Sequence, residues 1–165
     1  MRKLRLLTDC EGSALVEGAL LIPVLFILIY GVCDFSWFFY QQQLVGAGVR
    51  DAARYLARLP DSCNPASSDR LIVQARARNL AATGTIDGVV ARVGGWSAET
   101  ITVDCTAVVN PVVDSGLKRY RGGPLVYVVN VSTRFVGRSL GFFSFAHLEM
   151  PVMSVSHSER VIGPG

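Results

Sequence analysis

An apolar run near the start of the chain constrains the fold more than any other feature. The run from Ala14 to Cys33 has twenty residues and one charged side chain, Glu17. A helix of this length, with a rise of about 1.5 Å per residue, is about 30 Å long, which matches the hydrocarbon core of a bilayer. We therefore expect a membrane-spanning helix, so that any globular domain folds from the residues that follow it.

The two flanks of the run differ, and the difference predicts an orientation. Arg2, Lys3 and Arg5 lie on the short N-terminal side. Asp34 closes the run, and five aromatic residues follow at once: Phe35, Trp37, Phe38, Phe39 and Tyr40. Basic residues stay on the cytoplasmic side, and aromatic residues gather at the membrane interface. We predict a single-pass protein of the cytoplasmic membrane, with a cytoplasmic N-terminus and an extracytoplasmic C-terminal domain.

A cleaved secretory signal is the alternative for the same segment, because it also begins basic and becomes apolar. Such a signal has an apolar core of about 7–15 residues that ends at a small-residue cleavage site. Gly31-Val-Cys33 is a poor site of this kind, and apolar character continues through Phe39. These features favour an anchor.

Composition and motifs argue against several classes of function. The net charge is only +3, and no block of Lys and Arg forms the basic stripe of a nucleic-acid binder. The chain has no Gly-x-Ser-x-Gly elbow, His-Glu-x-x-His pair or phosphate loop. His147 and His157 are ten residues apart without a second ligand pair. We expect a protein that is not an enzyme and has no cofactor or metal.

The helical pattern continues beyond the apolar run. Apolar residues recur at three-to-four spacing as far as Leu59, and Pro60 ends the helix. We predict one continuous helix over residues 13–59, whose second half packs on a domain. Gly46 and Gly48 interrupt this half at about 1 kcal/mol each relative to Ala. They allow close packing or local melting or, as we favour, are merely tolerated at the membrane exit.

The remaining residues predict an α+β domain. Ser68 or Asp69 can cap a second helix over Arg70–Thr83, and Gly84 can end it. Four later segments are rich in β-branched residues and partly alternate: Val89–Val93, Ile101–Val109, Leu125–Phe135 and Met153–Val161. We expect an antiparallel sheet packed on the exposed half of the long helix, with an edge open to a neighbour.

The segment Leu140–Ala146, with sequence LGFFSFA, is apolar and precedes the last strand. We favour its burial as a closure of the core, which is the usual place of aromatic side chains. The alternative is an exposed patch that meets the membrane or a partner.

The four cysteines lie in three environments. Cys10 precedes the apolar run, and Cys33 lies at its outer end. Cys63 and Cys105 belong to the extracytoplasmic domain, in an oxidising space. A disulfide between them would close a loop of about 43 residues and contribute about 4 kcal/mol in the chain-entropy model. Two separate buried thiols are the alternative.

Glu17 stands five residues after a glycine, in the order basic leader, Gly12, Ser13-Ala-Leu-Val, Glu17 and apolar helix. This order resembles the processing site of type IV pilin-like precursors. The resemblance implies cleavage between Gly12 and Ser13 by a prepilin peptidase. It also implies that Glu17 pairs with the new N-terminal amine of a neighbouring subunit. An unpaired acid within a membrane costs about 2.5–3.5 kcal/mol on insertion scales, so a cationic partner gives it a physical reason.

A narrower resemblance covers about the first 58 residues. The carrying features are the Gly12–Glu17 motif, Pro23 within the run, Gly31 before an acid–Phe pair, and the segment Val49–Tyr55 (VRDAARY). Together they resemble the TadE-like family, minor pilin-like components of tight-adherence (Flp) pilus systems. Met153–Val161 resembles the closing strand of that family more weakly.

The resemblance implies a minor pilin-like subunit that acts in pilus assembly. Its partners would be other pilin-like subunits, the prepilin peptidase, the inner-membrane assembly platform and membrane lipid, with no nucleic acid. The expected organisation is a leader at 1–12, a transmembrane helix at 13–34, its extracytoplasmic continuation at 35–60, and an α+β domain at 61–165. The alternative function is a permanently anchored, uncleaved periplasmic module that binds envelope or pilus components.

Overall fold

The computed structural model describes residues 11–59, 62–113, 116–120 and 123–162. The basic leader residues, Cys10 and Pro60 therefore lie outside the described residues. The described chain divides into two compact units. The helix unit contains the first helix up to Trp37 together with Ser139–Glu149, and the sheet unit contains Phe38–Arg138 and the residues from Met150 onward.

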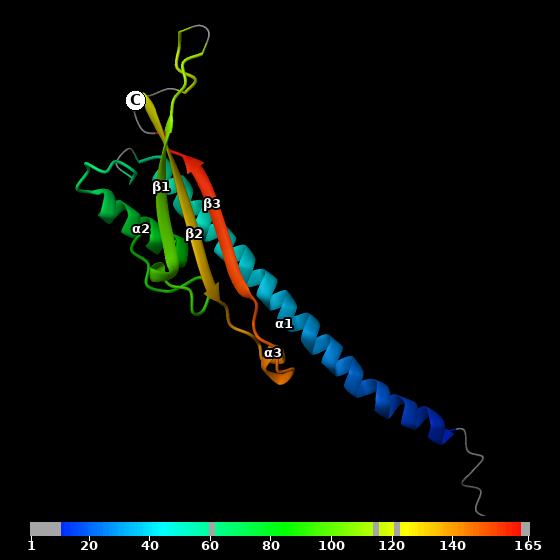
Figure 1. Ribbon diagram of the computed structural model, residues 1–165. Coiled ribbons are helices and arrows are strands. Elements are labelled where there is room, and N and C mark those ends of the chain that lie inside the picture. Colours follow the sequence, from blue (N-terminus) through cyan, green and yellow to red (C-terminus); the bar gives the residue numbers. More distant parts are fainter. Residues whose placement is uncertain (1–10, 60–61, 114–115, 121–122, 163–165) are drawn as a thin grey trace, which may run out of the picture. The chain divides into compact units, whose positions relative to one another are not determined.

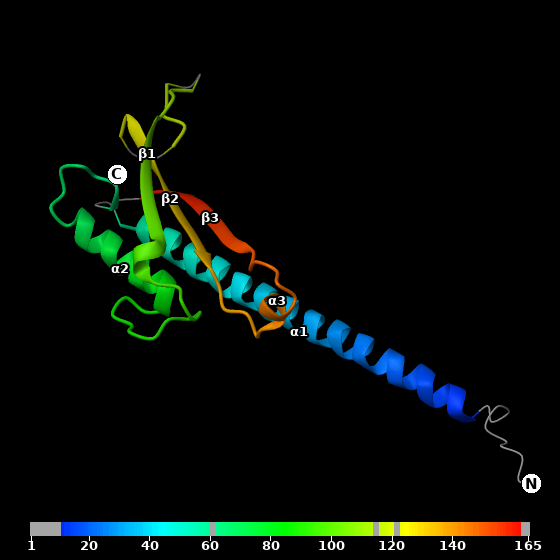
Figure 2. The ribbon, with the colours of Figure 1, turned by 60° about the horizontal axis from the view of Figure 1, so that its bottom comes forward.

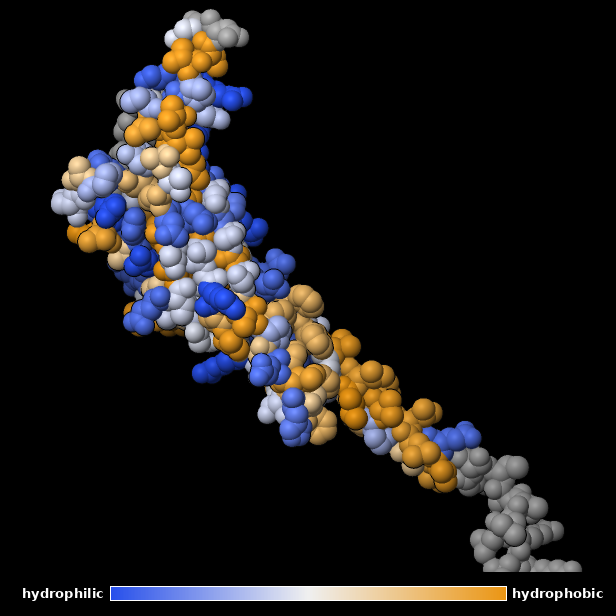
Figure 3. Space-filling view, in the orientation of Figure 1, coloured by the Kyte–Doolittle hydropathy of each residue, from blue (hydrophilic) through white to orange (hydrophobic). Residues whose placement is uncertain are grey.

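The first helix, α1, runs over 47 residues from Glu11 to Ala57. It begins and ends two residues before the predicted bounds, and it contains Pro23. The segment Leu15–Ala57 is the one helix among the described residues that is long and apolar enough to cross a membrane. Apolar side chains cover the N-terminal half of α1 (Figure 3), and most of them are exposed. The predicted continuous helix is confirmed.

Three strands form one antiparallel sheet in the order β1-β2-β3 (Figure 1). Strand β1 spans Ile101–Val109, β2 spans Leu125–Val136 and β3 spans Val152–Arg160. In the register Cys105 faces Val129. The predicted α+β class and these three strands are confirmed, each within one residue at its ends.

The prediction of a strand at Val89–Val93, the first of the four in chain order, is wrong, because these residues form a bent loop. Val89 and Val90 are 94% and 82% exposed, so their β-branched side chains have no facing strand to pack on. The loop is tied back to α2, the helix Arg70–Thr83, by a hydrogen bond from the Arg92 N–H to the Ala82 carbonyl (2.8 Å). A β-branched run becomes a strand only where another strand completes its ladder.

Helix α2 has the predicted bounds. Gly84 ends it with φ of +94°, a conformation that favours glycine, and donates its N–H to the Leu80 carbonyl (2.8 Å). Asp69 occupies the N-cap position, but its side chain makes no capping hydrogen bond. The sequence therefore predicted the N-cap position correctly, but it did not predict that the Asp69 side chain would leave the helix N–H groups uncapped.

The core of the sheet unit lies between α1, α2 and the sheet. Figures 1 and 2 show the C-terminal half of α1 (cyan) running along the sheet, with α2 beside β1. The buried face of α1 repeats at helical spacing, as the sequence predicts. The buried residues on α1, α2 and the sheet include Val45, Val49, Ala52, Leu56, Ala77, Ala81, Val129 and Val131. Trp96 is 1% exposed and stacks on Phe135 with ring centroids 5.9 Å apart.

The two glycines of the second half of α1 behave differently. A Cβ on Gly48 would collide with the Ala81 carbonyl oxygen and would lie 2.7 Å from the Trp96 ring. Gly46 has open space around it. Close packing therefore explains Gly48, where mere tolerance was the favoured interpretation, and tolerance remains the explanation for Gly46.

Candidate functional site

The residues of the predicted processing site all lie on one stretch of α1. Gly12 and Ser13 belong to its first turn, and Glu17 follows one turn later with an exposed side chain. This placement keeps the predicted scissile bond and the predicted pairing acid on the same helix. Cleavage, and pairing of Glu17 with another subunit, stay predictions.

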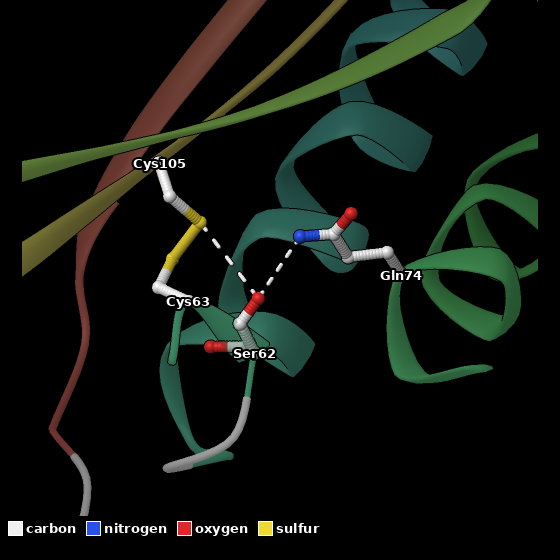
Figure 4. The surroundings of a disulfide bond; sticks show 4 residues. All are labelled: Ser62, Cys63, Gln74 and Cys105. Carbon is white, nitrogen blue, oxygen red and sulfur yellow. Dashed lines mark hydrogen bonds between the residues drawn. A yellow bond between two sulfur atoms is a disulfide. The ribbon is translucent and has the colours of Figure 1, made fainter. Parts of the chain in front are cut away.

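Cys63 and Cys105 are joined by a disulfide, as compartment reasoning favoured over two separate thiols (Figure 4). Their Cα atoms are 5.6 Å apart, which lies within the usual range for a bridge. The Ser62 carbonyl beside the bridge accepts a hydrogen bond from Gln74 Nε2 (3.0 Å) and contacts Cys105 Sγ (3.7 Å). The bridge thus ties the loop after α1 to β1, and Gln74 ties the same loop to α2.

A second cluster of polar contacts centres on Asp34, which is completely buried in the helix unit. Its Oδ2 accepts hydrogen bonds from the Ser139 hydroxyl (2.6 Å) and from the backbone N–H of Phe142 (2.9 Å). Its Oδ1 accepts from the Leu140 N–H (2.7 Å), and the Phe143 N–H lies 3.4 Å from Oδ2. We call this arrangement the Asp34 clamp.

The clamp gives a buried acid the donors that water would otherwise supply. A buried charge is tolerated where hydrogen bonds satisfy it, and bonds to an ionised group are the stronger kind. The donors come from the start of α3, the short helix Phe142–Phe145, and from the two residues before Gly141. The Gly141 φ of +120° lets the chain turn here, so that successive N–H groups point at one carboxylate.

Aromatic contacts surround the clamp. Tyr30 donates its hydroxyl to the Leu140 carbonyl (2.8 Å) and meets the Phe142 ring edge-on at 5.9 Å. Phe35 meets Phe143 in the same manner at 5.1 Å. A Cβ on Gly31 would lie 3.1 Å from the Phe142 ring, so the glycine allows the ring to approach α1 closely.

Sequence reasoning placed Asp34 at the end of the apolar run and did not assign it to a site. Its partners lie more than a hundred residues further along the chain, so no local pattern connects them. The favoured burial of Leu140–Ala146 is right for Phe143, which is 4% exposed, and wrong for Leu140 and Phe145, which are 51% and 65% exposed. The segment is therefore fixed on one side and open on the other.

An apolar groove of about 470 Å³ runs beside the clamp. It is lined by α1 and by one side chain of α3, and its lining residues are Phe26, Ile27, Ile29, Tyr30, Cys33 and Phe145. All of them belong to the helix unit.

Histidine positions support no metal centre in the described part of the chain. No group of three or more His, Cys, Asp or Glu side chains there is arranged to hold a metal ion. His157 lies on the edge strand β3 with Nε2 3.0 Å from Glu159 Oε1, and His147 is exposed. Both are edge or surface residues.

These features define a class of protein: one helix compatible with a single-pass membrane anchor, which continues into a small disulfide-bonded α+β domain. A family model described as TadE-like protein matches residues 12–54, which lie within α1. Over these residues the chain is similar to the TadE-like family, and the resemblance found in the sequence is confirmed there. The family indicates a role in tight-adherence pilus systems and is not a family of enzymes. Comparison with curated proteins and with solved structures gave no match.

Proposed function

We propose that this chain is a minor pilin-like subunit that acts in the assembly of a tight-adherence (Flp) pilus. The observation that carries the proposal is the TadE-like match, which begins at Gly12, the residue at which the leader would be cut. A prepilin peptidase would cleave between Gly12 and Ser13. The mature chain would then begin with an ammonium group one turn before Glu17.

The geometry of α1 supports this processing. Cleavage would remove the basic leader with the first two residues of α1 and leave the apolar part of the helix intact, because α1 continues without a break to Ala57. The processed protein would keep its membrane anchor, with its sheet unit outside the cytoplasm. An extracytoplasmic location agrees with the disulfide between Cys63 and Cys105.

Glu17 would supply the attraction that brings subunits together. Two opposite charges 4 Å apart attract by about 4 kcal/mol at an effective dielectric constant of 20. Because an acid in the hydrocarbon region is costly, the amine of a neighbouring subunit offsets that cost only when the two helices lie side by side. The partners of this chain would thus be other pilin-like subunits, together with the peptidase and the inner-membrane assembly platform.

Processing is tested by the intact mass and N-terminal sequence of the protein from pilus-producing cells. We expect Ser13 as the first residue, and we expect Gly12→Leu to keep Met1. Gly18→Leu is the matched control, since Gly18 lies on the same helix with open space around it and its replacement leaves the predicted scissile bond intact. Retention of Met1 in the natural protein would overturn the proposal and favour an uncleaved, anchored binding module.

The role of Glu17 is tested separately by Glu17→Gln, which keeps the size of the side chain and removes its charge. We expect normal cleavage and normal abundance in the membrane, with loss of surface pili. Glu149→Gln, at another exposed acid of the helix unit, should leave pili intact. Normal piliation with Glu17→Gln would show that the carboxylate has no part in assembly.

A further inference from the structure

The segment Ser139–Leu148, which contains α3, is held against the outer part of the apolar run. The Asp34 clamp, the Tyr30 hydroxyl and the close approach of Phe142 to Gly31 fix it at the level of the last two turns before Asp34. Any medium that surrounds these turns of α1 therefore also surrounds the segment.

The outer face of the segment is apolar. Leu140, Phe145 and Leu148 are 51%, 65% and 54% exposed. At the same level α1 exposes Ile29 and Val32, at 52% and 66%. Phe145 forms one wall of the groove whose other wall is α1. The apolar surface is thus continuous from the helix onto the segment, and it is larger than a scatter of single exposed side chains.

Most backbone N–H groups of the segment are satisfied without water. The N–H groups of Leu140, Phe142 and Phe143 point at Asp34, and that of Gly141 donates to the Ser139 hydroxyl. Four N–H groups after Ser144 find carbonyls within the segment: those of Phe145, Ala146, His147 and Leu148 donate to Gly141, Phe142, Ser144 and Phe143. Non-helical backbone is tolerated at membrane depth only where its polar groups are paired in this way.

Polar residues limit how deep the segment can lie. His147 and Glu149 are both exposed at its C-terminal end. An apolar face that carries an aromatic anchor and ends in ionisable residues fits the boundary between acyl chains and head groups.

We propose that Ser139–Leu148 is a second membrane-contacting element, which places Leu140, Phe145 and Leu148 among the acyl chains beside α1. The groove between α1 and Phe145 holds acyl chain. The Asp34 clamp makes this possible, because the carboxylate and three backbone N–H groups satisfy one another's hydrogen bonds at the membrane surface. The inference rests on the proposed anchoring of α1.

The test uses the full-length protein in vesicles of phosphatidylcholine and phosphatidylglycerol. A nitroxide is attached to Phe145→Cys in a background where Cys10 and Cys33 are serine and the disulfide is intact. Collision with oxygen, which enters the bilayer, is compared with collision with a water-soluble nickel chelate. Leu28→Cys on α1 is the reference for lipid, and Glu99→Cys in the sheet unit is the reference for water.

We expect the label at position 145 to collide more with oxygen than with nickel, as at position 28, and at every lipid-to-protein ratio. A label at 145 that behaves like the one at 99, while position 28 remains in lipid, overturns the proposal and leaves the anchor intact. If position 28 also meets nickel, the anchoring itself is refuted. Shielding at 145 from both reagents that disappears on dilution into lipid means that a second copy fills the groove, which also overturns the proposal.

Discussion

Replacement of Asp34 tests the clamp most directly, because two substitutions remove different numbers of its hydrogen bonds. Asp34→Ala leaves the Ser139 hydroxyl and two well-placed N–H groups, those of Leu140 and Phe142, without an acceptor. Each buried donor left unpaired costs about 1–3 kcal/mol. The three donors, unlike the Asp34 carboxylate, are only partly buried, so water can reach them once the carboxylate is gone. We therefore expect a total near the low end for three donors, about 3–4 kcal/mol.

Asp34→Asn is the milder change. An amide oxygen in the place of Oδ2 keeps the bonds from Ser139 and Phe142, while the amide nitrogen faces the Leu140 N–H, donor against donor. One lost bond of this kind costs about 1–2 kcal/mol. The two variants therefore predict a graded opening of Ser139–Leu148.

Hydrogen exchange of the peptides that cover Ser139–Leu148 measures this opening in detergent micelles. Each 1.4 kcal/mol is a tenfold change, so exchange should accelerate about 100- to 1,000-fold with Asp34→Ala and about 5- to 30-fold with Asp34→Asn. Ser36→Ala is the control, since the Ser36 hydroxyl bonds only to its own helix at the Val32 carbonyl. Exchange within about twofold of the natural protein in both variants, the range of a neutral surface change, would refute the reasoning.

Three further changes have defined outcomes. Gly48→Ala should destabilise the sheet unit by about 1–3 kcal/mol through overpacking, whereas Gly46→Ala should stabilise it by up to about 1 kcal/mol. Chemical denaturation measures the free energy of unfolding of both variants, and equal effects would contradict the packing argument. Cys105→Ser should lower the free energy of unfolding by about 4 kcal/mol, and a loss below about 1 kcal/mol would show that the bridge constrains little. Phe145→Glu should weaken the contact of Ser139–Leu148 with vesicles, measured as a loss of protection from protease. Ser144→Glu, at the neighbouring position, should have a smaller effect. A larger effect of Ser144→Glu would contradict a lipid-facing Phe145.

Sequence reasoning succeeded where the determinants are local. Helix α2 has its predicted bounds because Gly84 ends it within the same stretch of chain, and β1 has its predicted bounds because alternation and β-branching coincide there. Val89–Val93 shows the limit of this reasoning. Its composition is that of a strand, yet strand formation depends on a partner strand, and the described part of the chain places none beside it.

The candidate site shows the same division. Gly12, Ser13 and Glu17 form a contiguous motif, so they could be singled out from the sequence. The role of Asp34 could not be predicted, because its hydrogen-bond partners are Ser139 and the residues after it, which only the fold brings to the helix. Gly48 likewise could not be distinguished from Gly46 until Trp96 was seen to pack on one of them.

The covalent bridge between Cys63 and Cys105 also determines how the protein bears tension. If a subunit is extracted from the membrane through its helix while neighbouring subunits hold its sheet, the chain between the helix and the sheet is under tension. The bridge joins two residues that are 42 positions apart in the sequence, and it closes the chain between them, including all of α2, into a ring that such a pull does not lengthen. About 140–150 Å of extended chain is thereby kept from unravelling, so the force goes directly from the end of α1 into β1.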